Sequence, residues 1–157
     1  MTVDKTIASG LMRIVELLEK RAALVDQVAL YKQKYNHPIV DPEREKKIEK
    51  MILDHTTKKT SKKISQYYKK IFVESYARQN RITKTASTEH ISKTDLVDLY
   101  RPEITKCDEE LIRCLDCIYQ KKNTDLLEGI KQIQMKRRLS TTINSLLEKI
   151  CEDDELE

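Results

Sequence analysis

The sequence predicts an all-α protein, a helical bundle of long amphipathic helices. Only two glycines and three prolines occur in 157 residues, so the chain has few places at which to turn. Tryptophan is absent, and abundant leucine, isoleucine, lysine and glutamate favour long helices over sheet. Hydrophobic residues make up 39% of the chain, which is enough for one domain with a core. We therefore expect a single helical domain over residues 1–157, with residues 1–82 and 94–157 as its two halves.

Residues 3–35 are predicted to form one helix, which ends before Pro38 because proline disfavours helix at the preceding residue. Steps of three and four residues trace one face of this helix, namely Leu11, Ile14, Leu18, Arg21, Val25, Val28 and Lys32. Two of these positions carry a cation, and an unpaired buried cation is costly. Arg21 and Lys32 lie about 16 Å apart along the axis and could bracket a small dianion. The alternative is that both are solvated or paired with acidic residues of a neighbouring helix.

A second helix is predicted to begin at Pro42 and to end near Asp54. Asp41 suits the N-cap position, and proline suits the first helical position. Arg44 and Glu45 lie one turn before the apolar face of this helix, so we expect both to point toward the core that holds the two cations. The free N–H groups of a helix N-terminus also favour an anion or a hydroxyl.

A third helix is predicted from about Ser61 to Ile82, after a loop or frayed turn at Thr56–Lys63. Its buried face combines apolar and polar residues, namely Ile64, Tyr68, Ile71, Ser75, Gln79 and Ile82. The hydroxyl of Ser75 and the amide of Gln79 need hydrogen-bond partners, because an unpaired buried polar group costs roughly 1–3 kcal/mol. Three helices with polar side chains at core positions indicate a polar ligand pocket inside the bundle.

The second half follows a Ser/Thr-rich linker, Arg81–Lys93. The segment LYRPEITKCDEELIRCL is predicted to be helical, with one face made of Arg101, Ile104, Asp108, Leu111, Leu115 and Ile118. Pro102 places Arg101 at the mouth of this helix. The alternative for Arg101 is an exposed cap residue. A last helical stretch is predicted from Thr124 to about Ile150.

Charge and cysteine usage narrow the classes of function. The 30 basic and 26 acidic residues are interspersed and give a net charge of +4, which favours anionic ligands without indicating nucleic acid. No run of 18 apolar residues indicates a membrane span, and MTVDKTIASG lacks an apolar signal core, so the protein stays inside the cell or has lost a leader. The four cysteines do not have the spacing of a zinc site. We expect core thiols, or a disulfide to Cys151 if the protein is exported.

Several of these residues together resemble the AroQ-type, all-helical chorismate mutases. The resemblance covers about residues 7–82 and is carried by Arg21, Lys32, the PIVDPERE run with Asp41, Arg44 and Glu45, and Ser75 with Gln79. Short dimeric members carry an arginine in the first helix that reaches into the partner's site, and here that position is Asp4. Arg101 would replace it, which is similar to the secreted gamma subclass, where one chain completes its own site.

The resemblance implies conversion of chorismate to prephenate, a pericyclic rearrangement without a cofactor, a metal or a covalent intermediate. Lys32 and Gln79 would be the catalytic residues, because both can donate hydrogen bonds to the ether oxygen of chorismate. Six residues would bind the substrate: Arg21 and Arg101 its carboxylates, with Ser75 adding one bond, and Asp41, Arg44 and Glu45 its ring hydroxyl. Because an amide does not titrate, Gln79 predicts activity without a steep loss between about pH 5 and 8.

Two other functions stay open at this point. A related fold performs isochorismate–pyruvate lyase chemistry, although Asp41, Arg44 and Glu45 favour the mutase. The chain could instead be a helical effector or binding module that has lost turnover, because Asp4 replaces an arginine and the second half has few motif residues. As partners we expect chorismate, no nucleic acid and no membrane, with a homodimer as an option. The subclass resemblance favours export.

Overall fold

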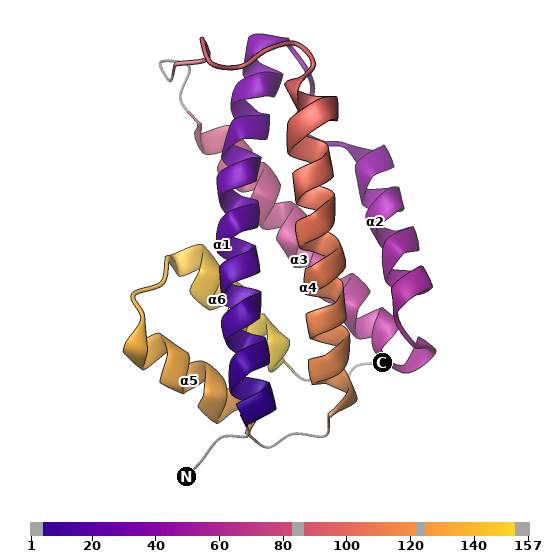
Figure 1. Ribbon diagram of the computed structural model, residues 1–157, viewed down its shortest axis with the longest axis vertical. Coiled ribbons are helices and arrows are strands. Elements are labelled where there is room, and N and C mark those ends of the chain that lie inside the picture. The colour runs from indigo at the N-terminus through magenta and orange to yellow at the C-terminus, as the bar shows by residue number, and fades with distance from the viewer. Residues whose placement is uncertain (1–4, 83–86, 122–124, 153–157) are drawn as a thin grey trace.

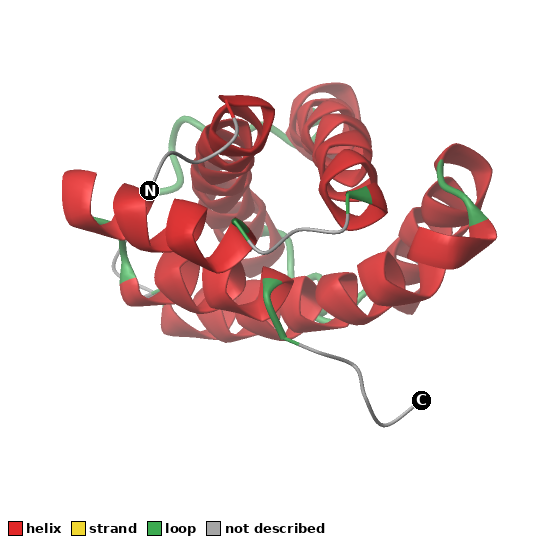
Figure 2. Cartoon of the chain, turned by 90° about the horizontal axis from the view of Figure 1, so that it is seen from below, coloured by secondary structure: helices red, strands yellow, loops and turns green. Residues whose placement is uncertain are grey.

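A computed structural model describes residues 5–82, 87–121 and 125–152. The described residues contain helices and loops but no strand, so the predicted all-α fold class is confirmed (Figure 2). In chain order the elements are α1 (Lys5–Lys34), α2 (Pro42–His55), α3 (Lys58–Arg81), the short π-helix η1 (Leu96–Tyr100), α4 (Arg101–Gln120), α5 (Leu126–Lys136) and α6 (Thr141–Ile150). Asp4 lies outside the described residues.

The helices pack around α1 and α4, which run side by side in opposite directions (Figure 1). Helix α3 crosses behind both of them, and α2 packs against α3 and α4 at one edge. The short helices α5 and α6 cover α1 and α3 on the other side. Helices from both halves of the chain therefore surround the same interior.

Two apolar clusters fill this interior. The larger one contains the first part of the predicted α1 face, Leu11, Ile14 and Leu18, whose side chains are at most 3% exposed. Each fully buried side chain of this kind contributes about 1.5–3 kcal/mol to folding. The smaller cluster gathers residues from the end of α1, from η1 and from the start of α4, including Val28 and Ile104. Arg21 lies on α1 between the residues of the two clusters.

Some predicted helix boundaries are wrong. Helix α3 begins at Lys58, inside the stretch predicted to be a loop, because the carbonyl of Thr57 already accepts from the backbone N–H of Ser61. The last predicted helix is two helices. The backbone is extended at Arg137 and Ser140, and the Ser140 hydroxyl accepts from the backbone N–H of Ile143, which starts α6. Thr124 lies outside the described residues.

The start of α4 also differs from its prediction. Arg101 does not stand at a free helix mouth, because η1 leads directly into α4. The backbone N–H of Arg101 donates to the carbonyl of Leu96, a bond over five residues that defines the π-turn. In a regular α-helix the ring of Pro102 would meet the carbonyl of Asp98, and the wider turn relieves this contact.

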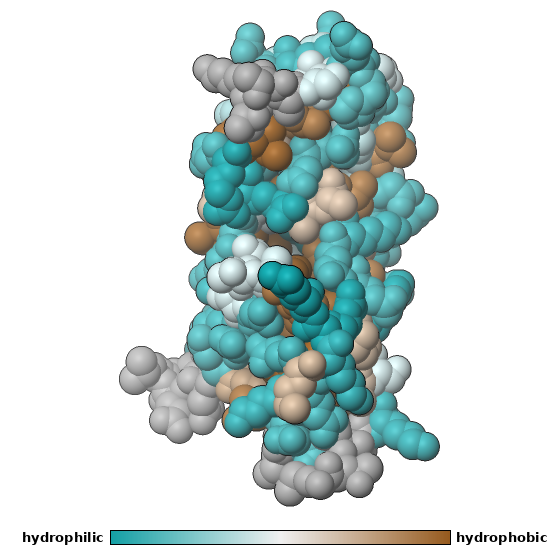
Figure 3. Space-filling view, turned by 90° about the vertical axis from the view of Figure 1, so that its left-hand side faces the viewer, coloured by the Kyte–Doolittle hydropathy of each residue, from teal (hydrophilic) through white to brown (hydrophobic). Residues whose placement is uncertain are grey.

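All four cysteines are free thiols, so the disulfide to Cys151 is wrong for this structure. The core prediction holds for Cys107, which is buried, but not for Cys117, which is exposed. Figure 3 shows a mainly hydrophilic face, on which hydrophobic side chains appear only in small separate patches. Within the described ranges, no helix is both long enough and apolar enough to cross a membrane.

Candidate functional site

All eight predicted site residues line one cavity at the junction of α1, α2, α3 and α4. They are Arg21, Lys32, Asp41, Arg44, Glu45, Ser75, Gln79 and Arg101. The free space between their side chains is small, about 60 Å³. Helical periodicity explains this meeting, because the α1 and α3 residues lie on the inward stripes of their helices. Arg101 comes from the second half of the chain.

Arg21 is paired with a carboxylate of the chain itself. Its Nε donates to Oδ1 of Asp108 over 2.8 Å, and its Nη1 donates to the hydroxyl of Ser75 over 2.7 Å. Burial alone would lower the pKa of Arg21, but the neighbouring Asp108 and Tyr68 raise it, and the net direction is upward. Of the two alternatives for this cation, pairing with an acidic residue of a neighbouring helix is therefore the one observed.

Asp108 contacts the candidate site through Arg21, and the sequence reasoning did not single it out. Its side chain is fully buried and accepts a second hydrogen bond, from the hydroxyl of Tyr68 over 2.8 Å. Its other oxygen, Oδ2, has no hydrogen-bond partner in the described part of the chain and lies 3.9 Å from Nη2 of Arg44. Asp108 follows Arg101 by two helical turns on the same face. An acidic residue in a buried stripe was the signal that could have identified it.

Lys32 lies in a different environment. It is 6% exposed, and its Nζ donates to the backbone carbonyl of Ile39 over 2.6 Å. It forms no ion pair within 4.0 Å with any residue that the structure describes. Burial lowers the pKa of Lys32, which Asp41 partly offsets and Arg101 reinforces. An ammonium has three donors, so two of them stay available to a ligand.

The N-terminus of α2 joins the two halves of the chain. Oδ1 of Asp41 accepts from the backbone N–H of Arg44 over 3.1 Å, which caps α2 as predicted. Oδ2 of Asp41 accepts from Nη2 of Arg101 over 2.7 Å. Arg44 in turn donates to the hydroxyl of Thr105 on α4 over 2.8 Å. Because Arg101 and Asp41 are only partly buried, their pair lies at the open side of the site.

Tyr76 links Glu45 to the backbone of Asp41 at one side of the cavity, and the sequence reasoning did not predict it either. Its hydroxyl donates to Oε2 of Glu45 over 2.5 Å and accepts from the backbone N–H of Asp41 over 3.2 Å. Burial and the hydrogen bond to Glu45 raise the pKa of Tyr76 to about 12. Tyr76 is one residue beyond Ser75 and therefore off the predicted α3 stripe, so periodicity gave no signal for it.

Gln79 is buried with its Oε1 unpaired among the residues that the structure describes. Turning the amide over would present Nε2 at the same place, so the side chain can offer either a donor or an acceptor. An open groove of about 770 Å³ reaches Lys32 and Gln79 from the loop around His37 and Ile39. A ligand therefore has a path to both side chains.

The cavity can bind and orient an anion. It gathers four cations, Arg21, Lys32, Arg44 and Arg101, and two carboxylates, Asp41 and Glu45, and the buried carboxylate of Asp108 contacts Arg21 from outside the cavity. Four fixed donors around a small space can stabilise charge that develops on a bound molecule, without water having to reorganise. Within residues 5–82, 87–121 and 125–152, no three His, Cys, Asp or Glu side chains are placed to hold a metal ion.

A family model and two solved structures that are similar to this chain all belong to chorismate mutases. Residues 12–80 match the family model of chorismate mutase type II. The crystal structure of chorismate mutase from Burkholderia thailandensis has a TM-score of 0.63 and 20% sequence identity, covering 90% of this chain and 96% of that one. For chorismate mutase from Burkholderia phymatum, the values are 0.61, 16%, 94% and 99%. No curated protein matches the sequence. The fold is thus the all-helical fold of these structures.

Proposed function

We propose that this chain is a chorismate mutase that converts chorismate to prephenate. The match to the chorismate mutase type II family over residues 12–80 and the two structural neighbours support this activity. One observation carries the proposal for the site itself. Arg21 and Lys32 from the first half of the chain and Arg101 from the second half line a single buried cavity.

The reaction needs no proton transfer and no covalent bond to the protein. Chorismate has two carboxylates, a ring hydroxyl and an ether oxygen that gains negative charge as its bond to carbon breaks. A millionfold gain in rate requires about 8 kcal/mol of preferential stabilisation of the transition state. This stabilisation must come from orientation and from donors that point at the developing charge.

Two arginines would hold the carboxylates. The Nε edge of Arg21 is held by Asp108, and Nη1 contacts the hydroxyl of Ser75, so the outer edge of the guanidinium is oriented before substrate arrives. A planar guanidinium suits bidentate pairing with a carboxylate. Arg101 would hold the second carboxylate. The free space is only about 60 Å³, so we expect the Arg101–Asp41 pair to open as substrate enters.

Lys32 and Gln79 would act on the ether oxygen. Among the described residues Lys32 donates to a single carbonyl and the Oε1 of Gln79 has no partner, and turning the Gln79 amide over would direct its Nε2 donor into the cavity. A hydrogen bond to developing charge is stronger in the transition state than in the substrate, which is the requirement for catalysis. The ring hydroxyl would lie at the α2 N-terminus, near Asp41, Arg44 and Glu45.

We further infer a likeness to the secreted gamma subclass. The pairing of Arg101 with Asp41 supports this, because the arginine that completes the site then comes from the same chain. Export and a role in aromatic amino acid biosynthesis follow from the subclass and the reaction, and they stay predictions. A homodimer also stays a prediction, and one chain would not need a partner's arginine.

The test is prephenate formation by the wild-type protein and by Arg21→Ala and Arg101→Ala. We expect each variant to lose about 10²–10³-fold in kcat/KM, because each removes a charged donor from the site. Arg13→Ala is the matched control on α1, since Arg13 forms an exposed pair with Glu110 and lies outside the cavity. Activity should survive in that variant.

The same assay separates the other functions. Release of pyruvate from isochorismate, with no prephenate from chorismate, would indicate a lyase. No turnover by a wild-type protein with intact helicity would indicate a binding or effector module and would overturn the proposed activity.

A further inference from the structure

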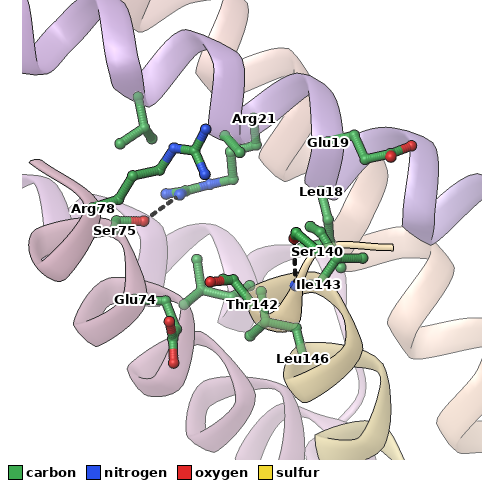
Figure 4. A pocket seen from close by; sticks show the side chains of 13 residues that line it. Leu18, Glu19, Arg21, Glu74, Ser75, Arg78, Ser140, Thr142, Ile143 and Leu146 are labelled. Carbon is green, nitrogen blue, oxygen red and sulfur yellow. Dashed lines mark hydrogen bonds between the residues drawn. The ribbon is translucent and has the colours of Figure 1, made fainter. Parts of the chain in front are cut away.

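A second cavity lies behind the candidate site, between α1, α3 and the start of α6 (Figure 4). We call it the α6 cavity, and the side chains that matter most are Leu18, Arg21, Ser75, Arg78, Thr142 and Leu146. Its volume is about 230 Å³, compared with about 60 Å³ in the candidate site. Arg21 and Ser75 line both cavities, so the two spaces meet at the same guanidinium and hydroxyl.

We propose that the α6 cavity binds a small organic monocarboxylate with an apolar body, and that this ligand opposes substrate binding through Arg21. The proposal of a ligand stands on the cavity itself. The proposed effect on substrate rests on the chorismate mutase function above.

One side of the α6 cavity carries the guanidinium groups of Arg21 and Arg78. Arg21 is 8% exposed, and within the described part of the chain its Nη2 makes no hydrogen bond, since Nε and Nη1 are taken by Asp108 and Ser75. Arg78 uses Nε and Nη2 for Asp26, and its Nη1 makes no hydrogen bond to a described residue. Figure 4 shows both guanidinium groups and the Ser75 hydroxyl together on one side of the opening.

Each guanidinium already has an acidic partner, because Arg21 pairs with Asp108 and Arg78 pairs with Asp26, so this side offers hydrogen-bond donors rather than excess positive charge. Glu19 and Glu74 also line the α6 cavity, but in Figure 4 their carboxylates point away from Arg21. Glu19 is held by Arg137, whose Nη2 donates to it over 2.9 Å. The opposite side begins with the first turn of α6, whose N-terminal N–H groups add partial positive charge. A carboxylate placed beside Arg21 would meet donors rather than acids.

Apolar side chains also line the α6 cavity, and its volume has room for one ring. Leu18 and Val25 of α1, Ile71 of α3, and Ile143 and Leu146 of α6 line it. An apolar cavity of about 150 Å³ in another protein accepts benzene, so about 230 Å³ accommodates a ring with a short acidic arm. The ligand class that fits both sides is an arylacetate or a comparable monocarboxylate.

The shared residues predict antagonism between the two cavities. A ligand carboxylate on the free edge of Arg21 would compete with a substrate carboxylate for the same guanidinium and for Ser75. Because binding free energies are linked, each ligand should weaken the other by the same factor. The antagonism should therefore raise KM for chorismate and leave kcat unchanged.

Phenylacetate is the probe, and calorimetry measures its binding without any turnover. We expect a dissociation constant on the order of 1 mM or lower for a ligand of this size. Phenylacetamide, which has the same shape and no charge, should bind at least about tenfold more weakly if Arg21 and Arg78 recognise the carboxylate. Absence of phenylacetate binding, or equal binding of the amide, would overturn the proposal.

Thr142→Phe places a ring in the α6 cavity from a half-buried position that is not part of the candidate site. Phenylacetate should then bind at least about tenfold more weakly, while kcat/KM for chorismate stays within about twofold. Thr141→Phe is the matched control, because Thr141 is the exposed neighbour on the same turn and should leave phenylacetate binding unchanged. Thr142→Leu gives a smaller version of the same change if the phenylalanine variant does not fold.

Unchanged phenylacetate binding in a folded Thr142 variant would show that the probe sits elsewhere and would overturn the α6 site. Binding at the α6 cavity with no rise in KM would overturn the antagonism alone. The binding result does not depend on the outcome of the mutase assay, because calorimetry detects binding in an inactive protein as well, whereas the rise in KM is measured only if the protein converts chorismate.

Discussion

Arg21 and Lys32 lie three turns apart on one face of α1, yet the protein treats their charges differently. Arg21 meets the fully buried carboxylate of Asp108 and the hydroxyl of Ser75. Among the described residues, Lys32 donates a hydrogen bond only to the backbone carbonyl of Ile39. The pKa of Arg21 is raised, because the effects of Asp108 and Tyr68 outweigh its burial. The pKa of Lys32 is lowered, and burial is the main cause.

The difference favours two separate roles for the two cations, with Arg21 in substrate binding and Lys32 in stabilisation of the transition state. At the Arg21 end the cation is neutralised and oriented before a ligand arrives, which suits binding of a carboxylate that is present throughout the reaction. At the Lys32 end no described residue forms an ion pair with the buried cation, so it gains most when negative charge develops next to it. A group that is poorly satisfied in the free protein and well satisfied in the transition state favours catalysis.

The largest expected effect comes from removing the carboxylate that pairs with Arg21. Asp108→Leu leaves a buried guanidinium without its anion, and we expect the free energy of unfolding to fall by about 3–5 kcal/mol. Denaturant unfolding followed by circular dichroism measures this. The double variant Arg21→Met with Asp108→Leu removes both charges and should regain most of the stability without regaining activity. A double variant as unstable as Asp108→Leu would contradict the role given to the pair.

Lys32→Ala removes the second cation of this α1 face. It should leave the free energy of unfolding nearly unchanged, while kcat falls about 10²–10³-fold. Lys20→Ala, an exposed α1 residue near Glu103, is the control. This contrast between a stability effect at Arg21 and a rate effect at Lys32 is the sharpest test of the comparison. A Lys32 variant that loses substrate affinity alone, with kcat intact, would contradict it.

The pH dependence of kcat tests the proposed roles of Lys32 and Gln79. Activity should be flat between about pH 5 and 8, because the amide of Gln79 does not titrate. Protonated Lys32 is the active form and its pKa is lowered, so activity should decline as pH rises through a value below that of an ordinary lysine. Gln79→Glu should restrict activity to acid pH, because glutamate donates only when protonated. A steep fall between pH 5 and 8 in the folded wild type would count against Gln79.

The smallest expected effect is at the α2 N-terminus. Tyr76→Phe removes the hydroxyl that joins Glu45 to the backbone N–H of Asp41, a loss of about 0.5–1.5 kcal/mol per hydrogen bond. KM for chorismate should rise a few-fold with kcat almost unchanged in steady-state assays. Tyr35→Phe, whose hydroxyl contacts the carbonyl of Ile91, is the control. A large fall in kcat for Tyr76→Phe would place this tyrosine in the reaction itself.

Part of the site could be predicted because helical periodicity is a local property. Spacing alone placed Arg21, Lys32, Ser75 and Gln79 on inward faces, and the structure has all four in one cavity. The Asp41 cap was predictable for the same reason, since an N-cap depends only on its own turn. Tyr76 could not be predicted, because its role depends on Glu45 and Asp41 of another helix.

The amino-acid sequence by itself determined the all-helical class, the inward faces of the helices and the residues that those faces carry. The tertiary structure alone decided that Asp108 neutralises Arg21 while Lys32 forms no ion pair with a described residue, that α4 begins in a π-turn, and that a second cavity meets the site at Arg21. The physical reason is the distance along the chain over which each interaction acts. Periodicity and capping act within a turn or two, whereas the charge state of a buried cation depends on side chains brought beside it from distant parts of the chain.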